Sequence, residues 1–275
     1  MSEPRVVVIT GATDGLGRAV AARAAADGDR VILHGRHPDR LAAASTEIAA
    51  ETGAEPPDTV VADLSSLAAV HTVADQLAAL TDHIDVLVNN AGVGGGQPDG
   101  TERRLTVDGN ELRFAVNYLA PFDLTLRSLP LLAPGGRIVN VASLGQSPIR
   151  FDDLTLASDY DGWYAYGQSK LALIIWGFCL ADKLDRITVN SLHPGTYMPT
   201  KMVLDNDIAE IDSLDSGIAA TTRLMGDPAL AGVTGRFFDR LNGETRAKSE
   251  SAYDPGVRER LWEISLKLTS APEPA

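Results

Sequence analysis

Tyr166 and Lys170 are the two residues of this sequence whose types and spacing most directly suggest chemistry. They stand four positions apart, so on a helix they share one face. Residues 164–184 are predicted to form that helix, because apolar side chains recur there at helical intervals. A phenol has an unperturbed pKa of about 10, and a nearby ammonium favours the phenolate and lowers that pKa. The pair is therefore a candidate general acid–base near neutral pH.

Other motifs raise this Tyr-x-x-x-Lys pair above an ordinary amphipathic helix. Alone, such a pair is more often an interfacial tyrosine beside a solvated lysine. Here residues 10–17 form a glycine-rich turn and residues 89–92 read Asn-Asn-Ala-Gly. Asn117 and Ser143 follow before Tyr166. Together these features predict a nucleotide site and a proton-transfer site in one domain.

The N-terminal segment has the pattern of a phosphate-binding strand, turn and helix. Residues 5–9 are mostly β-branched without polar alternation, as in buried parallel strands. The turn from Gly11 to Gly17 follows, and an alanine-rich helix over about residues 16–27 ends at Gly28. Free N–H groups and the positive end of the helix dipole would face a pyrophosphate. The segment therefore predicts nucleotide binding, with G-x-x-x-G-x-G spacing in place of the common G-x-G-x-x-G.

The end of the second strand bears on which nucleotide is bound. NAD-preferring sites usually carry an acidic residue there, whereas this strand ends in Gly35-Arg36, with Arg40 one helical turn further on. A guanidinium can pair with a 2′-phosphate, which a carboxylate would repel. We therefore predict NADP(H), with Arg36 as the main contact. The alternative is an ordinary solvated arginine, and Asp14 in the glycine turn mildly opposes the NADP assignment.

These motifs resemble those of the short-chain dehydrogenase/reductase family over nearly the whole chain. The family's T-G-x-x-x-G-x-G pattern matches residues 10–17, its N-N-A-G pattern residues 89–92, and its Asn-Ser-Tyr-Lys set Asn117, Ser143, Tyr166 and Lys170. Asp63-Leu64 and Pro194-Gly195 match two further motifs. The finer resemblance is to retinol-dehydrogenase-like and WW-domain-oxidoreductase-like members, through residues 31–36, 109–117, 136–143 and 191–196 and the long interval between Ser143 and Tyr166.

The resemblance implies a role for each residue of the catalytic set. Tyr166 would exchange a proton with the substrate oxygen, and Ser143 would hydrogen-bond that oxygen. Lys170 would bind the nicotinamide ribose and lower the pKa of Tyr166, and Asn117 would shape its helix and hold a proton-relaying water. The implied cofactor contacts are Gly11, Thr13, Asp14, Gly15, Leu16, Gly17, Arg36, Asp63, Leu64, Asn90, Ala91, Gly92, Tyr166, Lys170, Pro194, Gly195 and Tyr197.

The sequence departs from the family pattern at two places. The family often has a threonine shortly after Pro-Gly that binds the nicotinamide carboxamide, but Pro199 stands near that position. Thr196 or Thr200 are the alternatives for this contact. The chain also enters its first strand directly after residues 1–4, without the apolar stretch that anchors vertebrate retinol enzymes. A retinoid substrate therefore does not follow from the resemblance.

The alternation of strand and helix patterns predicts one α/β domain, a Rossmann fold over residues 1–275. At 275 residues and 44% hydrophobic, the chain can bury a full core. We expect about seven parallel strands, with helices on both faces of the sheet, at residues 6–9, 31–34, 59–62, 84–89, 136–142, 187–193 and 235–238. Residues 2–4 and a tail over about 270–275 are expected to be frayed or disordered.

Charge and cysteine usage exclude several classes of function. The net charge of −13 opposes binding to nucleic acids and to anionic membranes. No signal peptide pattern or membrane-spanning run is evident. Cys179 is the only cysteine and falls mid-helix among apolar residues, which favours core packing and fits a cytoplasmic location. Metal-ligating residues show no tight spacing, so we expect no metal.

Three loops are expected to carry the substrate side: residues 93–108, 144–164 and 197–214, the last as a mobile lid. Their aromatic and methionine side chains either line an apolar substrate pocket or pack the loops onto the body, and the sequence leaves both open. Residues 257–268 are predicted to cap the pocket. Helices at 110–132 and 164–184 are candidates for a homodimer or homotetramer interface. His193 is expected to be a packed or cofactor-side residue.

The favoured function is an NADP(H)-dependent carbonyl reductase or alcohol dehydrogenase acting on an apolar small molecule. Two alternatives stay open. The same scaffold could run a redox-neutral reaction, as an epimerase, dehydratase or cyclase. The second alternative is a non-catalytic NADP-sensing protein, which would need the nucleotide cradle but not Tyr166.

Overall fold

The structure, a computed structural model, describes residues 3–97 and 100–274. Residues 1–2, 98–99 and 275 lie outside the described residues. The parts of the predicted frayed ends and of the predicted substrate loop 93–108 that fall on them lie outside as well. Within the predicted tail, the Ser270 carbonyl accepts a hydrogen bond from Arg127, and Ala271 packs against the apolar core.

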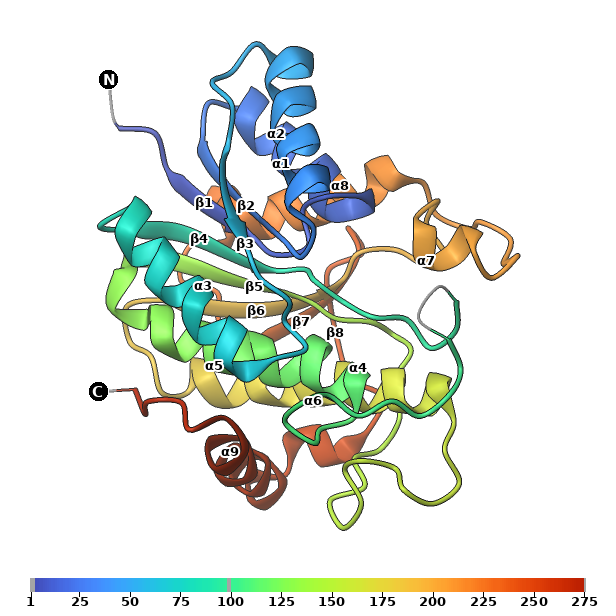
Figure 1. The fold of residues 1–275 in the computed structure, drawn as a ribbon. Helices are drawn as coiled ribbons and strands as arrows, with labels where there is room; N and C mark the ends of the chain where they lie inside the picture. The colour runs from blue at the N-terminus through green and yellow to red at the C-terminus, as the bar shows by residue number, and fades with distance from the viewer. Residues whose placement is uncertain (1–2, 98–99, 275) are drawn as a thin grey trace.

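The described residues form one eight-stranded sheet of order β3-β2-β1-β4-β5-β6-β7-β8 (Figure 1). Its first seven strands are parallel, as predicted, and β8 runs antiparallel to β7. The prediction missed β8 because two residues are too short for any alternating pattern. The strands are β1 (Val6–Ile9), β2 (Arg30–Gly35), β3 (Asp58–Val61), β4 (Ile84–Asn89), β5 (Leu132–Val141), β6 (Thr188–His193), β7 (Arg236–Asp239) and β8 (Glu244–Thr245).

Helices cover both faces of the sheet, and β1 shows why. Val7 and Ile9 pack into the apolar cluster under α1 (Gly15–Ala26), α2 (Pro38–Thr52) and α8 (Leu214–Gly226). Val6 and Val8 point to the opposite cluster, which lies under α3 (Leu67–Leu80), α5 (Ala120–Ser128) and α6 (Gly162–Ala181). Because successive strand residues face opposite sides, a strand buried on both faces must be apolar throughout.

Helix α6 is buried on nearly all sides, so its apolar side chains belong to the core of the domain. Leu171, Ile175 and Trp176 are at most 1% exposed. Helix α9 (Pro255–Thr269) packs outside this layer. Its Trp262 ring lies edge-on to Phe122, with ring centres 5.3 Å apart. No α9 residue is among the described residues that line the large cleft, so the prediction that residues 257–268 cap the substrate pocket was wrong. Cys179 lies on α6 and is buried, as expected.

The predicted helix over residues 110–132 is interrupted. The chain forms a short α4 (Leu112–Phe114), a π-helical turn (Ala115–Leu119) and then α5, followed by a 3₁₀ turn (Leu129–Leu131). The extra residue in a π-helical turn shifts the side chains that follow it. Asn117 stands in the middle of this turn.

Candidate active site

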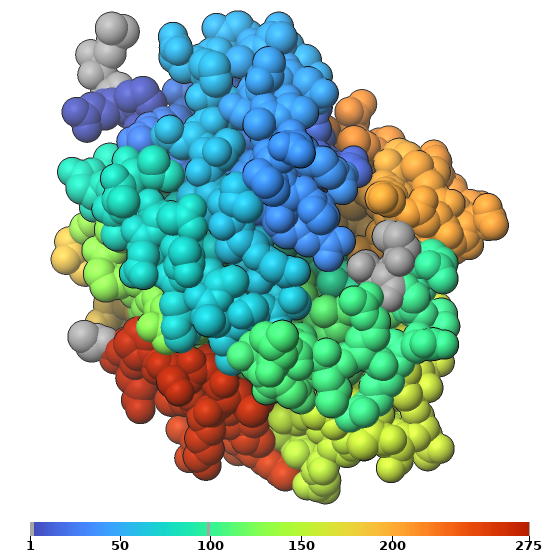
Figure 2. Space-filling view, viewed as in Figure 1, coloured from blue at the N-terminus to red at the C-terminus, as the bar shows by residue number. Residues whose placement is uncertain are grey.

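A cleft of about 780 Å³ opens at the carboxyl ends of the parallel strands. It spans the point between β1 and β4 where the strand order reverses, which is where ligands bind in open α/β sheets. All the predicted cofactor contacts line it, and so does Ser143. Asn117 does not. Figure 2 shows the segment that carries α7 (Lys201–Leu204), in orange, beside the blue N-terminal residues at this side of the molecule.

The glycine turn is shaped by backbone approaches that no side chain could enter. Gly11 has a φ of +67°, a conformation that glycine adopts without strain. A Cβ on Gly17 would overlap the Gly11 carbonyl oxygen and the Asn90 amide. The Asp14 carboxylate caps α1 by accepting from the Gly15 N–H at 2.7 Å. The first turn of α1, with the positive end of its dipole, therefore lies at the cleft.

The Asn-Asn-Ala-Gly segment fixes this turn from the neighbouring strand. The Asn90 amide donates to the carbonyls of Thr10 at 2.8 Å and Gly11 at 3.1 Å. In return, the Thr10 hydroxyl accepts from the backbone N–H groups of Asn90 at 3.0 Å and Ala91 at 3.1 Å. Four hydrogen bonds thus join the ends of β1 and β4 below the cleft.

His34 on β2 supports the turn from its other side, and sequence reasoning missed it. Its Nδ1 accepts from the Gly11 N–H at 3.4 Å, while Nε2 lies 3.1 Å from the Ala62 carbonyl. Burial lowers the pKa of His34 to about 4, so the ring is neutral near pH 7, with one nitrogen accepting and the other donating. The available signal was a polar residue inside an apolar strand.

Two arginines stand at the adenosine end of the cleft in different states. Arg40 pairs with Asp14 at 3.2 Å. Arg36 is exposed and lines the cleft, and it has no ion pair within the part of the chain that the structure describes. A guanidinium without a carboxylate partner is available to an anionic group. The opposition that Asp14 offered to an NADP site is weakened, because its charge is paired with Arg40.

Ser143, Tyr166 and Lys170 meet at the floor of the cleft. Ser143 follows the end of β5, and its hydroxyl lies close enough to Tyr166 to lower the pKa of that phenol. Tyr166 and Lys170 share a face of α6, as their spacing predicted, and the Lys170 Nζ lies 5.7 Å from the Tyr166 ring centre. Asp161 begins the helix by accepting from the Tyr164 N–H at 2.6 Å.

The electrostatics of Tyr166 differ from the prediction. Burial raises its pKa, and the hydrogen bond from Ser143 offsets only part of this increase. Lys170 is not among the groups that lower this pKa, and its ammonium donates to the Val141 carbonyl at 2.8 Å. Burial also lowers the pKa of Lys170 to about 8. A phenol with a raised pKa stays protonated at neutral pH, so Tyr166 holds a proton but releases it less readily than a free phenol would.

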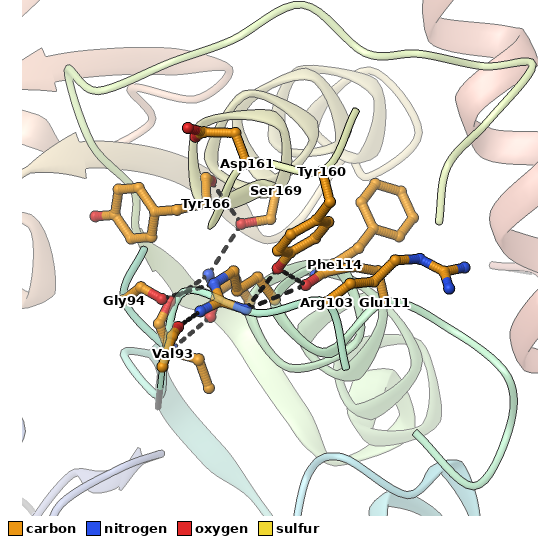
Figure 3. Close-up of polar contacts among 12 residues, drawn as sticks. Val93, Gly94, Arg103, Glu111, Phe114, Tyr160, Asp161, Tyr166 and Ser169 are labelled. Atoms are coloured by element: carbon orange, nitrogen blue, oxygen red, sulfur yellow. Dashed lines mark hydrogen bonds and ion pairs between the residues drawn. The ribbon is translucent and has the colours of Figure 1, made fainter. Parts of the chain in front are cut away.

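Asn117 is fully buried, one layer behind the cleft. Its amide group donates to the Val93 carbonyl at 3.0 Å and to the Ser169 hydroxyl at 2.9 Å, and its oxygen accepts from the Val93 N–H at 2.7 Å. Ser169 in turn donates to the Tyr166 carbonyl at 2.7 Å. Figure 3 labels Val93, Ser169 and Tyr166 in this part of the structure. Asn117 therefore ties the loop after β4 to the catalytic helix.

The turn at Pro194-Gly195 is held by His193 and by two residues that sequence reasoning did not select, Asp212 and Arg240. Asp212 accepts from the Thr196 N–H at 2.7 Å and from Arg240 at 2.8 Å. His193 Nε2 lies 2.9 Å from the Thr196 hydroxyl, and burial lowers the pKa of His193 to about 4. Thr196 and Thr200, the two candidates for carboxamide binding, both line the cleft. His193 lines it too, which agrees with a packed, cofactor-side residue.

Some aromatic and methionine side chains of the predicted substrate loops line the cleft, and others pack against the body of the protein. Trp163, Met198 and Met202 line the cleft. Phe151 and Tyr160 do not; Phe151 packs under Arg260, with 4.5 Å between the guanidinium carbon and the ring centre. The two alternatives left open by the sequence are thus each correct for part of the set.

Two features are absent from the described residues. None of their helices is long and apolar enough to cross a bilayer. Across residues 3–97 and 100–274, no three His, Cys, Asp or Glu side chains gather as metal ligands would. The expected lack of a metal stays a prediction.

Several known proteins resemble this chain in sequence and in fold. A family model described as short chain dehydrogenase matches residues 5–210. Human retinol dehydrogenase 13 is 32% identical, over 98% of this chain and 86% of its own length. An uncharacterized protein from Mycobacterium paratuberculosis has a TM-score of 0.79 at 30% identity, covering 98% of this chain and 95% of its own. A short chain dehydrogenase from Shigella flexneri, solved complexed with NADP, has a TM-score of 0.68 at 27% identity, covering 86% and 97%.

These matches extend over the same residues that form the sheet and the cleft. The family model covers every strand from β1 to β6, and so the glycine turn and the Ser143, Tyr166 and Lys170 cluster. The likeness to retinol dehydrogenase 13 extends over almost all of the chain. The chain therefore belongs to the short-chain dehydrogenase/reductase family, as a retinol-dehydrogenase-like member, and is an oxidoreductase of a family that uses a nicotinamide cofactor.

Proposed function

We propose that this chain is an NADP(H)-dependent oxidoreductase that interconverts an apolar ketone or aldehyde and the corresponding alcohol. The observation that carries the proposal is the cluster of Ser143, Tyr166 and Lys170 in the same cleft as the glycine turn. A phosphate cradle and a proton donor are both needed for hydride transfer to a carbonyl. A nucleotide-sensing protein would need only the first.

The residues of the chain would handle the oxygen and the proton, while the nicotinamide supplies the hydride when bound. The hydroxyls of Ser143 and Tyr166 would hydrogen-bond the carbonyl oxygen and stabilise the charge that develops on it. Tyr166 would give its proton to the carbonyl oxygen while the carbonyl carbon receives the hydride, so that the carbonyl becomes an alcohol. Lys170, a few ångströms deeper, would bind the ribose hydroxyls and help to replace the proton on Tyr166.

The preference for NADP(H) rests on Arg36. Its exposed guanidinium lines the cleft at the end of β2, without an ion pair among the described residues. A 2′-phosphate placed there would find a fork of N–H donors that suits its geometry. The Shigella flexneri relative complexed with NADP supports the same cofactor.

An apolar substrate would fit the other end of the cleft. Part of the cleft lining is apolar and comes from several segments: Val93, Leu112, Val116, Trp163, Met202 and Ile208. Pockets of this kind bind through buried apolar area, while a few polar groups set the orientation. Here those polar groups would be the Ser143 and Tyr166 hydroxyls.

The decisive experiment measures binding and turnover separately. Fluorescence titration with NADPH and NADH would give both dissociation constants, and the reduced-nicotinamide absorbance would follow oxidation against a panel of apolar ketones and aldehydes. We expect tighter NADPH binding and one alcohol formed per NADPH oxidised. Tight NADPH binding with product formed but no net oxidation would instead favour the redox-neutral alternative. Binding without turnover would favour a sensor.

Two further parts of the proposal concern the protein in the cell. We propose a cytoplasmic location and assembly into a homodimer or homotetramer. Fractionation of expressing cells would test the first, and light scattering of the purified protein the second.

A further inference from the structure

Arg113 is a charged residue with no exposed surface, and it lies outside the cleft lining. It pairs with Glu111, which is 1% exposed, at 3.4 Å. Burying two charges costs free energy that their attraction offsets only when other hydrogen bonds are well made. A net gain in stability therefore does not explain why this ion pair is buried. The other hydrogen bonds of Arg113 show which segments the pair positions.

The Arg113 guanidinium joins three segments of the chain. Nε donates to the Gly94 carbonyl at 2.7 Å, Nη2 donates to the Gly100 carbonyl, and Nη1 donates to the Tyr160 hydroxyl at 2.7 Å. The Tyr160 hydroxyl in turn donates a hydrogen bond to the Glu111 carboxylate at 2.9 Å. Figure 3 shows Glu111, Tyr160 and Gly94 converging on this point. The start of α4, the loop after β4 and the segment before α6 are thus fixed to one another.

The loop that Arg113 holds contains a run of three glycines, Gly94–Gly96, and each makes room for a different side chain. A Cβ on Gly94 would come within 2.8 Å of Met202, and one on Gly95 within 2.5 Å of Trp163. A Cβ on Gly96 would overlap Asn206. Asn206 also hydrogen-bonds both backbone groups of Gln97, donating to the carbonyl at 2.6 Å and accepting from the N–H at 2.9 Å. The glycine run therefore makes room for the first turn of α6 and for the segment that carries α7.

The seated side chains form the substrate end of the cleft. Trp163 and Met202 both line it. The Trp163 ring also packs edge-on against Tyr166, with ring centres 6.3 Å apart. A shift of the glycine run would therefore move the wall of the pocket next to the proton donor, while leaving the glycine turn and Arg36 untouched.

We propose that Arg113, clamped by Glu111 and Tyr160, is a positioning residue that sets the shape of the substrate end of the cleft through the Gly94–Gly96 run. The proposal rests on the proposed function in one respect, that this end receives the carbonyl substrate. A guanidinium suits the task because its rigid fork reaches two carbonyls and a hydroxyl at once, which an ammonium does not. Arg113 touches no reacting atom and affects turnover only through the loop.

Tyr160→Phe is the mildest test, because it removes one hydroxyl and leaves the buried ion pair. Tyr164→Phe is the matched control, since the Tyr164 hydroxyl donates only to the surface carbonyl of Pro148, at 3.0 Å. We expect Tyr160→Phe to raise KM for bulky ketones by about tenfold, with kcat for a small ketone and the NADPH dissociation constant unchanged. The control should change none of these values.

A second readout needs no turnover, so it separates this proposal from the proposed function. Trp163 is 44% exposed, whereas Trp176 and Trp262 are 1% and 3% exposed, so acrylamide quenching of tryptophan fluorescence reports mainly on Trp163. Tyr160→Phe and Arg113→Lys should both increase quenching, Arg113→Lys the more strongly. If the wild-type protein reduces no carbonyl, the quenching result still stands. Unchanged quenching in both variants, in folded protein with unchanged NADPH affinity, would overturn the proposal.

Discussion

The two ends of the cleft are built by different means. At the nucleotide end, strand ends and backbone form the surface, and Asn90 and His34 fix the glycine turn through main-chain groups. At the substrate end, three loops are held by side chains that sit behind the wall, chiefly Arg113 and Asn206. Strand ends are rigid because the sheet fixes them, whereas loops keep their place only through contacts of this kind.

This difference separates the expected effects of substitution. Changes at the nucleotide end should alter cofactor affinity whatever the second substrate is. Changes behind the substrate end should alter KM for large substrates and leave the cofactor dissociation constant alone. Tyr166 lies where the two ends meet, so its removal should affect the reaction far more than either binding step.

Tyr166→Phe should produce the largest effect. Loss of the proton donor is expected to lower kcat by about 100-fold or more, while the fold and the NADPH dissociation constant stay near wild-type values. Steady-state kinetics and fluorescence titration on the same preparation would measure both. Activity above a tenth of wild type would remove Tyr166 from its assigned role.

Gly17→Ala should disable the nucleotide end. The added methyl group would overlap the Gly11 carbonyl oxygen and the Asn90 amide, so the turn must move. We expect the NADPH dissociation constant to rise by at least about tenfold. Gly256→Ala, in α9 and far from the cleft, is the control and should leave the dissociation constant unchanged. Wild-type affinity in Gly17→Ala would show that the turn tolerates the shift.

Arg36→Asp should change cofactor choice without disabling the cleft. A carboxylate at this position would repel the 2′-phosphate but has little to repel in NADH. We expect KM for NADPH to rise about tenfold more than KM for NADH. Arg40→Ala is the comparison, because Arg40 is already paired with Asp14. An equal change of KM for both cofactors would count against the 2′-phosphate contact.

Acidification should lower the free energy of unfolding through His34 and His193, and this should be the smallest of the expected effects. The pKa of His34 and of His193 is lowered to about 4 in the folded protein, below the unfolded value of 6.5. The unfolded chain therefore binds more protons between these values, and stability that is full above pH 6.5 is lost as pH falls towards 4. At about pH 5, each histidine would contribute on the order of 1–2 kcal/mol of this loss.

Urea unfolding at neutral pH and at about pH 5 would measure this change. His34→Gln keeps a donor for the Ala62 carbonyl but cannot be protonated. It should therefore remove roughly half of the pH dependence, if the two histidines contribute equally. The same midpoint shift in wild type and His34→Gln would exclude His34 as a source.

Sequence reasoning placed the nucleotide end well because its signals are local. The turn at residues 10–17 and the Tyr166–Lys170 pair are contiguous in the chain, and their spacing fixes their geometry once strand and helix form. The seven parallel strands were found in the same way. The resemblance implied that Asn117 shapes its helix, but the π-helical turn itself was not predicted, since no local pattern encodes the hydrogen bonds of Asn117 to Val93 and Ser169.

The raised pKa of Tyr166 shows the same limit. Spacing put Lys170 beside it, but only the packing around α6 shows that the ammonium donates to Val141 and that burial outweighs the neighbouring hydroxyl. Residues 257–268 looked amphipathic, and nothing in that pattern indicated that they would cover α5 and α6 instead of the cleft.

The sequence alone determined the α/β class, the glycine turn, the family resemblance and the identity of Ser143, Tyr166 and Lys170, because each depends on residue type and on distances along the chain. The tertiary structure decided which loop side chains line the cleft, how Arg113 joins three segments, and how burial shifts the pKa values. These properties come from contacts between residues far apart in sequence and from the exclusion of water around them, and no local pattern encodes either.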